Sequence, residues 1–345
     1  MCVVIRLQKS LQVFRGTQVF KFYQKKNQYR AVRILFLITL LIYLMLGSVS
    51  AQITDASQRV QRGVELYKEG KFQEAISLWH SALNEYKKIN NAGFAALVSE
   101  NLARAYQQIG DSKQAISAFE GAVNYYQTAS DLQQVGRMQT ELGQVYNSIG
   151  QPRKAIALVC GEISKKDKLK YAELSASIST LQKYEEYREI LVDCKRNQNT
   201  AFALAEKHRD NKGKVAAIGT LGEAYRRIGK YEIAIQFLED AQKISEPSYQ
   251  ASVLNSLGNA YALRAARWEL FADSAKQSQV PHETFQKESE QSYKEAYNKF
   301  QEGLEYARAG NDKPNEMRFL LNLIRLGYRA HKLKILNNQD IDKLI

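Results

Sequence analysis

The stretch Leu221–Ala241 reads LGEAYRRIGKYEIAIQFLEDA, and two other stretches of the chain follow the same pattern. They are LARAYQQIGDSKQAISAFEGA at Leu102–Ala122 and LGQVYNSIGQPRKAIALVCG at Leu142–Gly161. In each, a small residue is followed three positions later by tyrosine, seven later by glycine and twelve later by alanine. The register extends in part to Gly63 and Gly258, so the chain is built from internal repeats.

Each repeated position has a physical role in a pair of antiparallel helices. Residues three and four apart lie on one face of a helix, which gives each helix an apolar stripe. The first small residue and the later alanine let the two helices approach closely where they cross. The glycine lies at the end of the first helix, where a left-handed turn is easiest without a side chain. Because a single pair cannot bury its apolar face, the pairs must stack into a solenoid.

This pattern resembles the tetratricopeptide repeat (TPR), in a long variant with about 40 residues per unit. The ranges that match best are 56–125, 131–162 and 216–245. The resemblance implies an all-α fold, a right-handed superhelical solenoid of antiparallel helix pairs. It also implies that the first helix of each unit lines a concave groove in which partners bind.

Two regions depart from the regular unit. Gly143 and Gly222 are 79 residues apart, close to two periods, and we therefore expect one degenerate helical unit between them. After Tyr261, the expected alanine occurs only at Ala296, so about 26 extra residues form one elongated helical hairpin near the C-terminus, with its tip at Pro281. Its aromatic residues are expected to pack the two arms together, with a projecting docking element as the alternative; they are Trp268, Phe271, Phe285 and Tyr293.

The repeats divide the chain into six parts. The first is a basic leader at residues 1–51, and the last is an incomplete terminal helical unit at 310–345. Between them we expect TPR units 1–3 at 52–162, the degenerate helical unit at 163–215, a TPR unit at 216–250 and the TPR unit with the elongated hairpin at 251–309.

The leader has the three parts of an export signal. Residues 1–54 contain eight Lys or Arg and no acidic residue, and the mostly apolar run Ile34–Leu46 is followed by small residues ahead of Gln52. Since eight of the 13 net positive charges lie there, the basic character indicates no nucleic-acid partner. We expect export to the periplasm or the extracellular space after cleavage, with membrane anchoring by residues 34–51 as the alternative.

The leader, the long units, the ALVCG element, the elongated hairpin and the LLNLIRL helix give the chain a characteristic layout. This layout resembles the N-terminal TPR region of bacterial proteins that end in a CHAT domain, a caspase-like protease fold. The resemblance covers residues 34 to about 336. In that family the catalytic His and Cys lie in the C-terminal domain, to which no part of this chain corresponds. No catalytic residue is therefore assigned.

A search of the sequence for reactive constellations also indicates a protein that is not an enzyme. The four histidines (His80, His208, His282 and His331) lack metal-ligand spacing, and no Gly-rich phosphate loop or Gly-x-Ser-x-Gly elbow occurs. We expect no catalytic, metal-binding or cofactor-binding residues. Cys160 and Cys194 are expected to be reduced and buried, with a disulfide between them as the alternative in an exported chain.

The remaining function is binding to a protein or peptide partner. The TPR resemblance places residues around the small position of each first helix in the groove. These peptide-binding candidates are Glu100, Arg104, Gln107, Gln108, Gln144, Asn147, Glu223, Arg226, Arg227, Asn255 and Asn259. They are polar and amide-rich, as suits an extended peptide backbone or an acidic segment.

Three functions fit these observations. We expect a non-catalytic, exported interaction scaffold that binds peptide or protein partners through the groove. The first alternative is a regulatory or substrate-binding fragment of a CHAT-type protease whose catalytic domain is missing or separately encoded. The second is a protein held at a membrane surface by its leader. The sequence does not define the partner or the oligomeric state.

Overall fold

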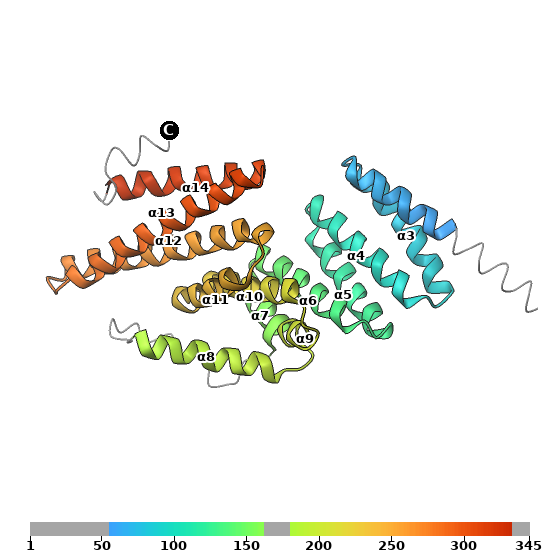
Figure 1. Cartoon of the computed structure of the whole chain (residues 1–345), viewed down its shortest axis with the longest axis horizontal. Helices are drawn as coiled ribbons and strands as arrows, with labels where there is room; N and C mark the ends of the chain where they lie inside the picture. Colours follow the sequence, from blue (N-terminus) through green and yellow to red (C-terminus); the bar gives the residue numbers. More distant parts are fainter. Residues whose placement is uncertain (1–54, 162–179, 333–345) are drawn as a thin grey trace, which may run out of the picture.

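The computed structural model describes residues 55–161 and 180–332, and every regular element in these ranges is a helix. A first helix at 55–68 precedes the helices labelled in Figure 1. These are α3 (Phe72–Lys88), α4 (Ala92–Gln108), α5 (Ser112–Thr128), α6 (Leu132–Ser148), α7 (Pro152–Cys160), α8 (Thr180–Arg196), α9 (Ala201–Lys207), α10 (Asn211–Arg227), α11 (Tyr231–Ile244), α12 (Pro247–Gln277), α13 (Glu283–Ala309) and α14 (Lys313–Lys332). The leader lies outside the described residues. The all-α solenoid predicted from the repeats is confirmed.

The turn inside each pair forms as the repeat predicts. Gly110 and Gly150 both have φ +77°, in the left-handed region, and they end α4 and α6. The next backbone amide closes the turn: Asp111 N–H donates to the carbonyl of Tyr106 at 2.9 Å. The side chain of Asp131 then caps α6 by accepting from the backbone N–H of Gln134 at 3.2 Å.

The small residues lie where the two helices of a pair cross. A Cβ added to Gly222 of α10 would lie 2.5 Å from Cγ of Leu238 in α11. A Cβ added to Gly258 of α12 would lie 2.3 Å from Cε1 of Phe300 in α13. Phe300 follows Ala296 by four residues, as Leu238 follows Ala234, so the elongated hairpin keeps the register of the regular pairs.

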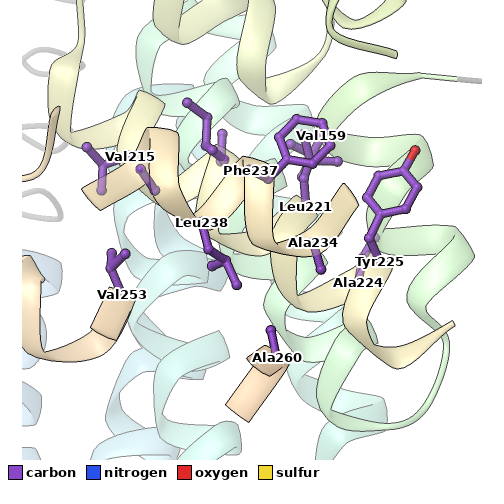
Figure 2. Close-up of a cluster of buried hydrophobic side chains, with 14 of the residues drawn as sticks. Val159, Val215, Leu221, Ala224, Tyr225, Ala234, Phe237, Leu238, Val253 and Ala260 are labelled. Carbon is purple, nitrogen blue, oxygen red and sulfur yellow. The ribbon is translucent and has the colours of Figure 1, made fainter. Parts of the chain in front are cut away.

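Most of the stack shares one apolar core. It extends from Ala96 of α4 to Leu326 of α14, and a second cluster covers the N-terminal pairs. Figure 2 shows the middle of the large core, where Val159 of α7, Leu221 of α10 and Phe237 of α11 converge. All three side chains are fully buried. The units are therefore held by contacts between neighbours, as a solenoid requires.

Of the degenerate helical unit expected at 163–215, the structure describes residues 180–215, and their arrangement differs from that expectation. Helix α7 ends at Cys160 after nine residues, and α9 takes the place of the missing half of the same second helix. The backbone N–H of Asp210 donates to the carbonyl of Ala205 just as that of Asp131 donates to Tyr126, so α9 keeps the repeat register. Helix α10 then packs directly against α6 and α7. The chain thus carries an insertion at 162–200 within one unit, and the described part of this insertion adds no further unit to the stack.

Three contacts hold the described part of this insertion to the stack. Cys160 and Cys194 form a disulfide and are both buried. We expected a reduced pair from the sequence, and the structure instead has the alternative, the disulfide. Asn197 Nδ2 donates to the carbonyl of Cys160 at 2.8 Å, which satisfies a carbonyl at the broken end of α7. The ring of Tyr187 in α8 packs edge-on against Phe237 of α11, with ring centroids 4.9 Å apart.

The elongated hairpin is formed by α12 and α13, at the end of the molecule where α14 lies beside α13 (Figure 1). Trp268 stacks on Phe285 with ring centroids 5.8 Å apart, and Phe271 meets Trp268 edge-on at 5.6 Å. Tyr293 is buried and donates a hydrogen bond to Glu269 at 2.8 Å. The aromatic residues therefore pack the two arms together, as expected.

Candidate protein-binding face

Each pair contributes its first helix to one face of the stack, and polar contacts join these helices to one another. Arg104 of α4 donates to Glu141 of α6, with Nη2 2.7 Å from Oε1. Arg137 of α6 donates to Asp210, the N-cap residue of α10, with Nε 2.7 Å from Oδ2. We call the surface formed by α4, α6, α10, α12 and α14 the first-helix face.

Two of the sequence candidates, Glu100 and Arg104, are engaged in holding the stack together. Glu100 is only 8% exposed and accepts a hydrogen bond from the Tyr126 hydroxyl at 2.7 Å. Burial and the neighbouring Glu100 carboxylate raise the pKa of Tyr126, which keeps that hydroxyl a donor. The hydrogen bond to Glu141 raises the pKa of Arg104, whose guanidinium also pairs with Glu100 at 2.8 Å. Both side chains join helices; Glu100 is buried and offers little to a partner, whereas the Arg104 side chain stays 43% exposed while it makes these bonds.

Asn147 has a similar structural role between α6 and α10. It is 3% exposed, and its Nδ2 donates to the carbonyl of Thr220 at 3.0 Å. This is a bond between two first helices, because Asn147 lies in the last turn of α6 and Thr220 lies in α10. The Thr220 hydroxyl makes a separate hydrogen bond within α10, donating to the carbonyl of Ala216 at 2.8 Å.

At the end of α10, Glu223 forms ion pairs with two arginines. Its Oε1 lies 2.6 Å from Arg226 Nη2 and 2.6 Å from Arg227 Nε. Burial acts to raise the pKa of Glu223, but the hydrogen bonds and charges of the two arginines outweigh it and lower that pKa. Arg226 is half-buried, whereas Arg227 is exposed. Arg227 is therefore the cation of this group that a partner can reach.

Asn255 and Asn259 of α12 are half-buried and bonded within the protein. Asn259 Nδ2 donates to the backbone carbonyl of Asn255 at 2.8 Å. The Asn255 side chain in turn accepts from Asn322 Nδ2 of α14 at 2.9 Å, which joins two further first helices.

Three glutamines remain exposed on the first-helix face: Gln107 and Gln108 in the last turn of α4, and Gln144 in α6. Within the described part of the chain, none of their side chains makes a hydrogen bond to the protein. First helices of successive repeats run in the same direction, so their last turns lie along one edge of the stack. Gln107, Gln108, Gln144 and Arg227 therefore form the part of the candidate set that is open to a partner, and we call them the amide row.

The most important polar contact of this face was missed from the sequence. Asp210 caps α10 by accepting from the backbone N–H of Gly213 at 3.0 Å, and it also accepts from Arg137. The hydrogen bond from Arg137 is the main cause that lowers the pKa of Asp210. The sequence feature that could have indicated this contact is an aspartate directly before a first helix: Asp210 precedes α10 as Asp131 precedes α6.

Two further features are absent from the described residues. No group of three or more His, Cys, Asp and Glu side chains there is arranged to hold a metal ion. Within residues 55–161 and 180–332, no helix combines the length and the apolar character needed to span a membrane.

Several solved structures are similar to this chain. A putative kinesin light chain from Podosopora anserina with nearly identical TPR-like repeats is 17% identical, with 70% of this chain and 95% of that chain covered and a TM-score of 0.42. BtubC (BKLC) from P. vanneervenii is 14% identical, with 76% and 92% covered and a TM-score of 0.42. The TPR2AB domain of yeast Sti1 in complex with pHSP90 is 16% identical, with 79% of this chain and 99% of that chain covered and a TM-score of 0.27.

No match was found among curated proteins. Two family models match parts of the sequence. The model described as soluble NSF attachment protein, SNAP, matches residues 47–159, and a tetratricopeptide repeat model matches residues 215–247. The second range covers most of α10 and all of α11, the pair with the close crossing at Gly222. Together with the helical fold, these matches support a repeat protein of the tetratricopeptide type.

Proposed function

We propose that this chain is a non-catalytic scaffold that binds an extended peptide segment of a protein partner along the first-helix face. The contact residues in this proposal are the amide row: Gln107, Gln108, Gln144 and Arg227. A fold of the tetratricopeptide type commonly mediates interactions between proteins, and the proposal assigns that role to particular side chains of this chain.

The observation that supports the proposal is that some polar side chains of the first-helix face bond to neighbouring helices whereas others do not. Glu100, Arg104 and Asn147 are held by bonds to neighbouring helices. The glutamines of the amide row are exposed and make no such bonds in the described structure. A glutamine side chain whose NH₂ group and carbonyl oxygen are both unbonded can donate to a peptide carbonyl and accept from a peptide N–H.

The charge of the row favours an acidic segment. Arg227 is exposed at the end of α10, and Glu223 engages its Nε atom only. Because a guanidinium has five N–H donors in a planar fork, the remaining donors can still bind a carboxylate. The proposed ligand is therefore an extended peptide that carries an aspartate or glutamate next to its backbone contacts with the glutamines.

We also propose that the chain is exported. The leader has the parts of an export signal, and the Cys160–Cys194 disulfide suits an oxidising compartment. Cleavage ahead of Gln52 would release the repeats, whereas an uncleaved segment at 34–51 would anchor them to the membrane. The intact mass of the protein from its native host distinguishes the two.

Selection of peptides from a random display library, followed by fluorescence anisotropy, tests the binding proposal. A variant with Gln107→Ala, Gln108→Ala, Gln144→Ala and Arg227→Ala is expected to bind a selected peptide at least about tenfold more weakly, since several hydrogen bonds are lost. The matched control changes Gln114→Ala, Gln127→Ala and Arg153→Ala, which are exposed on second helices α5 and α7. Equal loss in the two variants would contradict the proposal.

A second proposal is supported by the layout of the chain. The long units, the leader and the elongated hairpin resemble the repeat region of CHAT-type proteases, so this chain would serve as the substrate-binding part of such an enzyme. Both proposals expect no peptidase activity from the chain alone. Peptidase activity that is lost on Cys160→Ala or Cys194→Ala would overturn both.

A further inference from the structure

The outer side of α14 carries an exposed row of large apolar side chains. Met317, Leu321, Ile324 and Tyr328 are 60%, 46%, 53% and 80% exposed. The opposite side of the helix, with Phe319, is buried against α13, since a Cβ on Gly303 would lie 2.2 Å from the Phe319 ring. Helix α14 is therefore apolar on two sides, and within the described part of the chain only the side with Phe319 is covered.

The register of the repeats shows why this row is unusual. Ile324 lies twelve residues after the N-cap Asp312, as Gly143 follows Asp131 and Gly222 follows Asp210. In the earlier first helices this position is glycine or alanine and lies directly under the second helix of the pair. A second helix placed as α11 lies on α10 would collide with Ile324. The row thus suits a helix at the wider spacing that interlocking large side chains require.

The spacing of the row also specifies a helix as its partner. The four residues follow one another at intervals of four, three and four, the a/d spacing of a coiled-coil seam. Such a seam inserts its side chains between those of a facing helix with the same spacing. Scattered exposed apolar residues show no such order.

The charge beside the row selects the partner's chemistry. Arg318 and Arg325 are exposed at the e positions of this seam, seven residues apart along one edge. Arg325 makes no ion pair in the part of the chain that the structure describes, and Arg318 bonds only to the neutral amide of Asn315. An acidic residue opposite either arginine would gain a charge-assisted bond. An antiparallel second copy would instead place arginines against arginines.

We propose that α14 docks an acidic amphipathic helix of a partner protein, with apolar residues against Met317, Leu321, Ile324 and Tyr328 and carboxylates against Arg318 and Arg325. This surface is separate from the amide row and does not depend on the function assigned to it. A partner could therefore engage the chain through a helix at α14 and through an extended segment elsewhere.

The test uses the full chain and a synthetic helical peptide with Leu at the a and d positions and Glu at e and g. Fluorescence anisotropy is expected to show saturable binding of this peptide and much weaker binding of the same peptide with Lys in place of Glu. Leu321→Ala/Ile324→Ala should weaken binding about tenfold or more, because the centre of the seam is lost. Leu263→Ala/Leu270→Ala, which removes exposed leucines of α12, should leave binding unchanged.

A second variant keeps the test independent of stability. Arg318→Glu/Arg325→Glu retains the apolar row and should invert the preference, so that the Lys peptide binds better than the Glu peptide. The amide-row variant should bind the Glu peptide as the wild type does, which separates this proposal from the proposed function. Equal affinity for the two peptides, or none for either, would overturn it.

Two other occupants would also overturn the proposal. If the row binds a second copy, sedimentation will show a dimer that Leu321→Ala/Ile324→Ala abolishes. If residues 333–345 cover the row, the Glu peptide will bind only after their removal.

Discussion

The close crossing of α10 and α11 predicts opposite effects for two identical substitutions in one helix. Gly222 and Gly219 are both in α10, three residues apart. A Cβ on Gly222 would lie 2.5 and 2.8 Å from Cγ and Cδ2 of Leu238, whereas a Cβ on Gly219 would meet nothing within 4 Å. Ordinary contacts between carbon atoms are about 3.5–4.0 Å, so Gly222→Ala forces Leu238 or α11 to move.

The magnitudes follow from two competing terms. Overpacking of a close-packed site costs about 1–3 kcal/mol, and replacing glycine with alanine inside a helix contributes about 1 kcal/mol in the other direction. Gly222→Ala should therefore destabilise the protein by up to about 2 kcal/mol, while Gly219→Ala should stabilise it by up to about 1 kcal/mol. The measurement is urea unfolding followed by far-UV circular dichroism, with hydrogen exchange in α10 as the local readout.

Removing the obstructing side chain supplies the decisive control. Leu238→Ala alone should cost about 2–5 kcal/mol, because a fully buried leucine leaves a cavity. In that background Gly222→Ala no longer meets Cγ or Cδ2 of residue 238, and its effect should change sign to stabilising. A destabilisation by Gly222→Ala that is the same in both backgrounds would refute the assignment of the cost to this contact.

The remaining predictions concern the insertion, a charge pair and the hairpin. Reducing the Cys160–Cys194 disulfide, which spans 34 residues, should lower the free energy of unfolding by about 2–4 kcal/mol, as measured by urea unfolding with and without reductant; an unchanged midpoint would contradict this. Asp210→Asn keeps the N-cap but removes the charge facing Arg137, so it should cost about 1–2 kcal/mol at neutral pH. Because the pKa of Asp210 is lowered in the folded protein, the wild-type advantage is present above the unfolded pKa of about 4 and is lost as pH falls through the folded value; urea unfolding at several pH values checks this, and a difference that persists in acid would contradict it. Phe285→Ala should shift the emission of Trp268 to the red by opening the aromatic stack, while the emission of the buried Trp79 should not change.

The local rules of the repeat could be predicted from sequence because each depends on contacts within one pair. The turn at Gly150 is closed by the bond from Gln151 N–H to the carbonyl of Tyr146, and the crossing at Gly222 involves Leu238, only 16 positions away. The elongated hairpin was predicted for the same reason, since Ala296 and Phe300 preserve the pattern of the shorter pairs. The turns and helix crossings within a unit thus depend on residues that are close in the sequence, and they can be predicted from it.

The insertion at 162–200 could not be predicted from spacing. One period of 40 residues with an insertion of 39 has the same length as nearly two periods, so the distance from Gly143 to Gly222 fits both arrangements. Only contacts distinguish them, such as that of Gly136 with Leu204, whose Cβ would lie 3.0 Å from a Cβ added at the glycine. Ala201 supplies the small buried residue that Ala122 supplies in the previous unit, and the stack therefore continues unbroken across the insertion.

The candidate site could be predicted only in part, for a reason that applies to any stacked repeat. A polar residue on a first helix has two uses: it can join the next unit or it can face a partner. The choice depends on residues far along the chain, since Arg104 is bound by Glu141 37 positions away and Asn147 by the carbonyl of Thr220 73 positions away. Gln144 occupies the same repeat position as Arg104, yet in the described structure it makes no bond to another unit. Ligand-facing residues in such a protein are therefore those left over after the bonds between units have been assigned, and that assignment requires the structure.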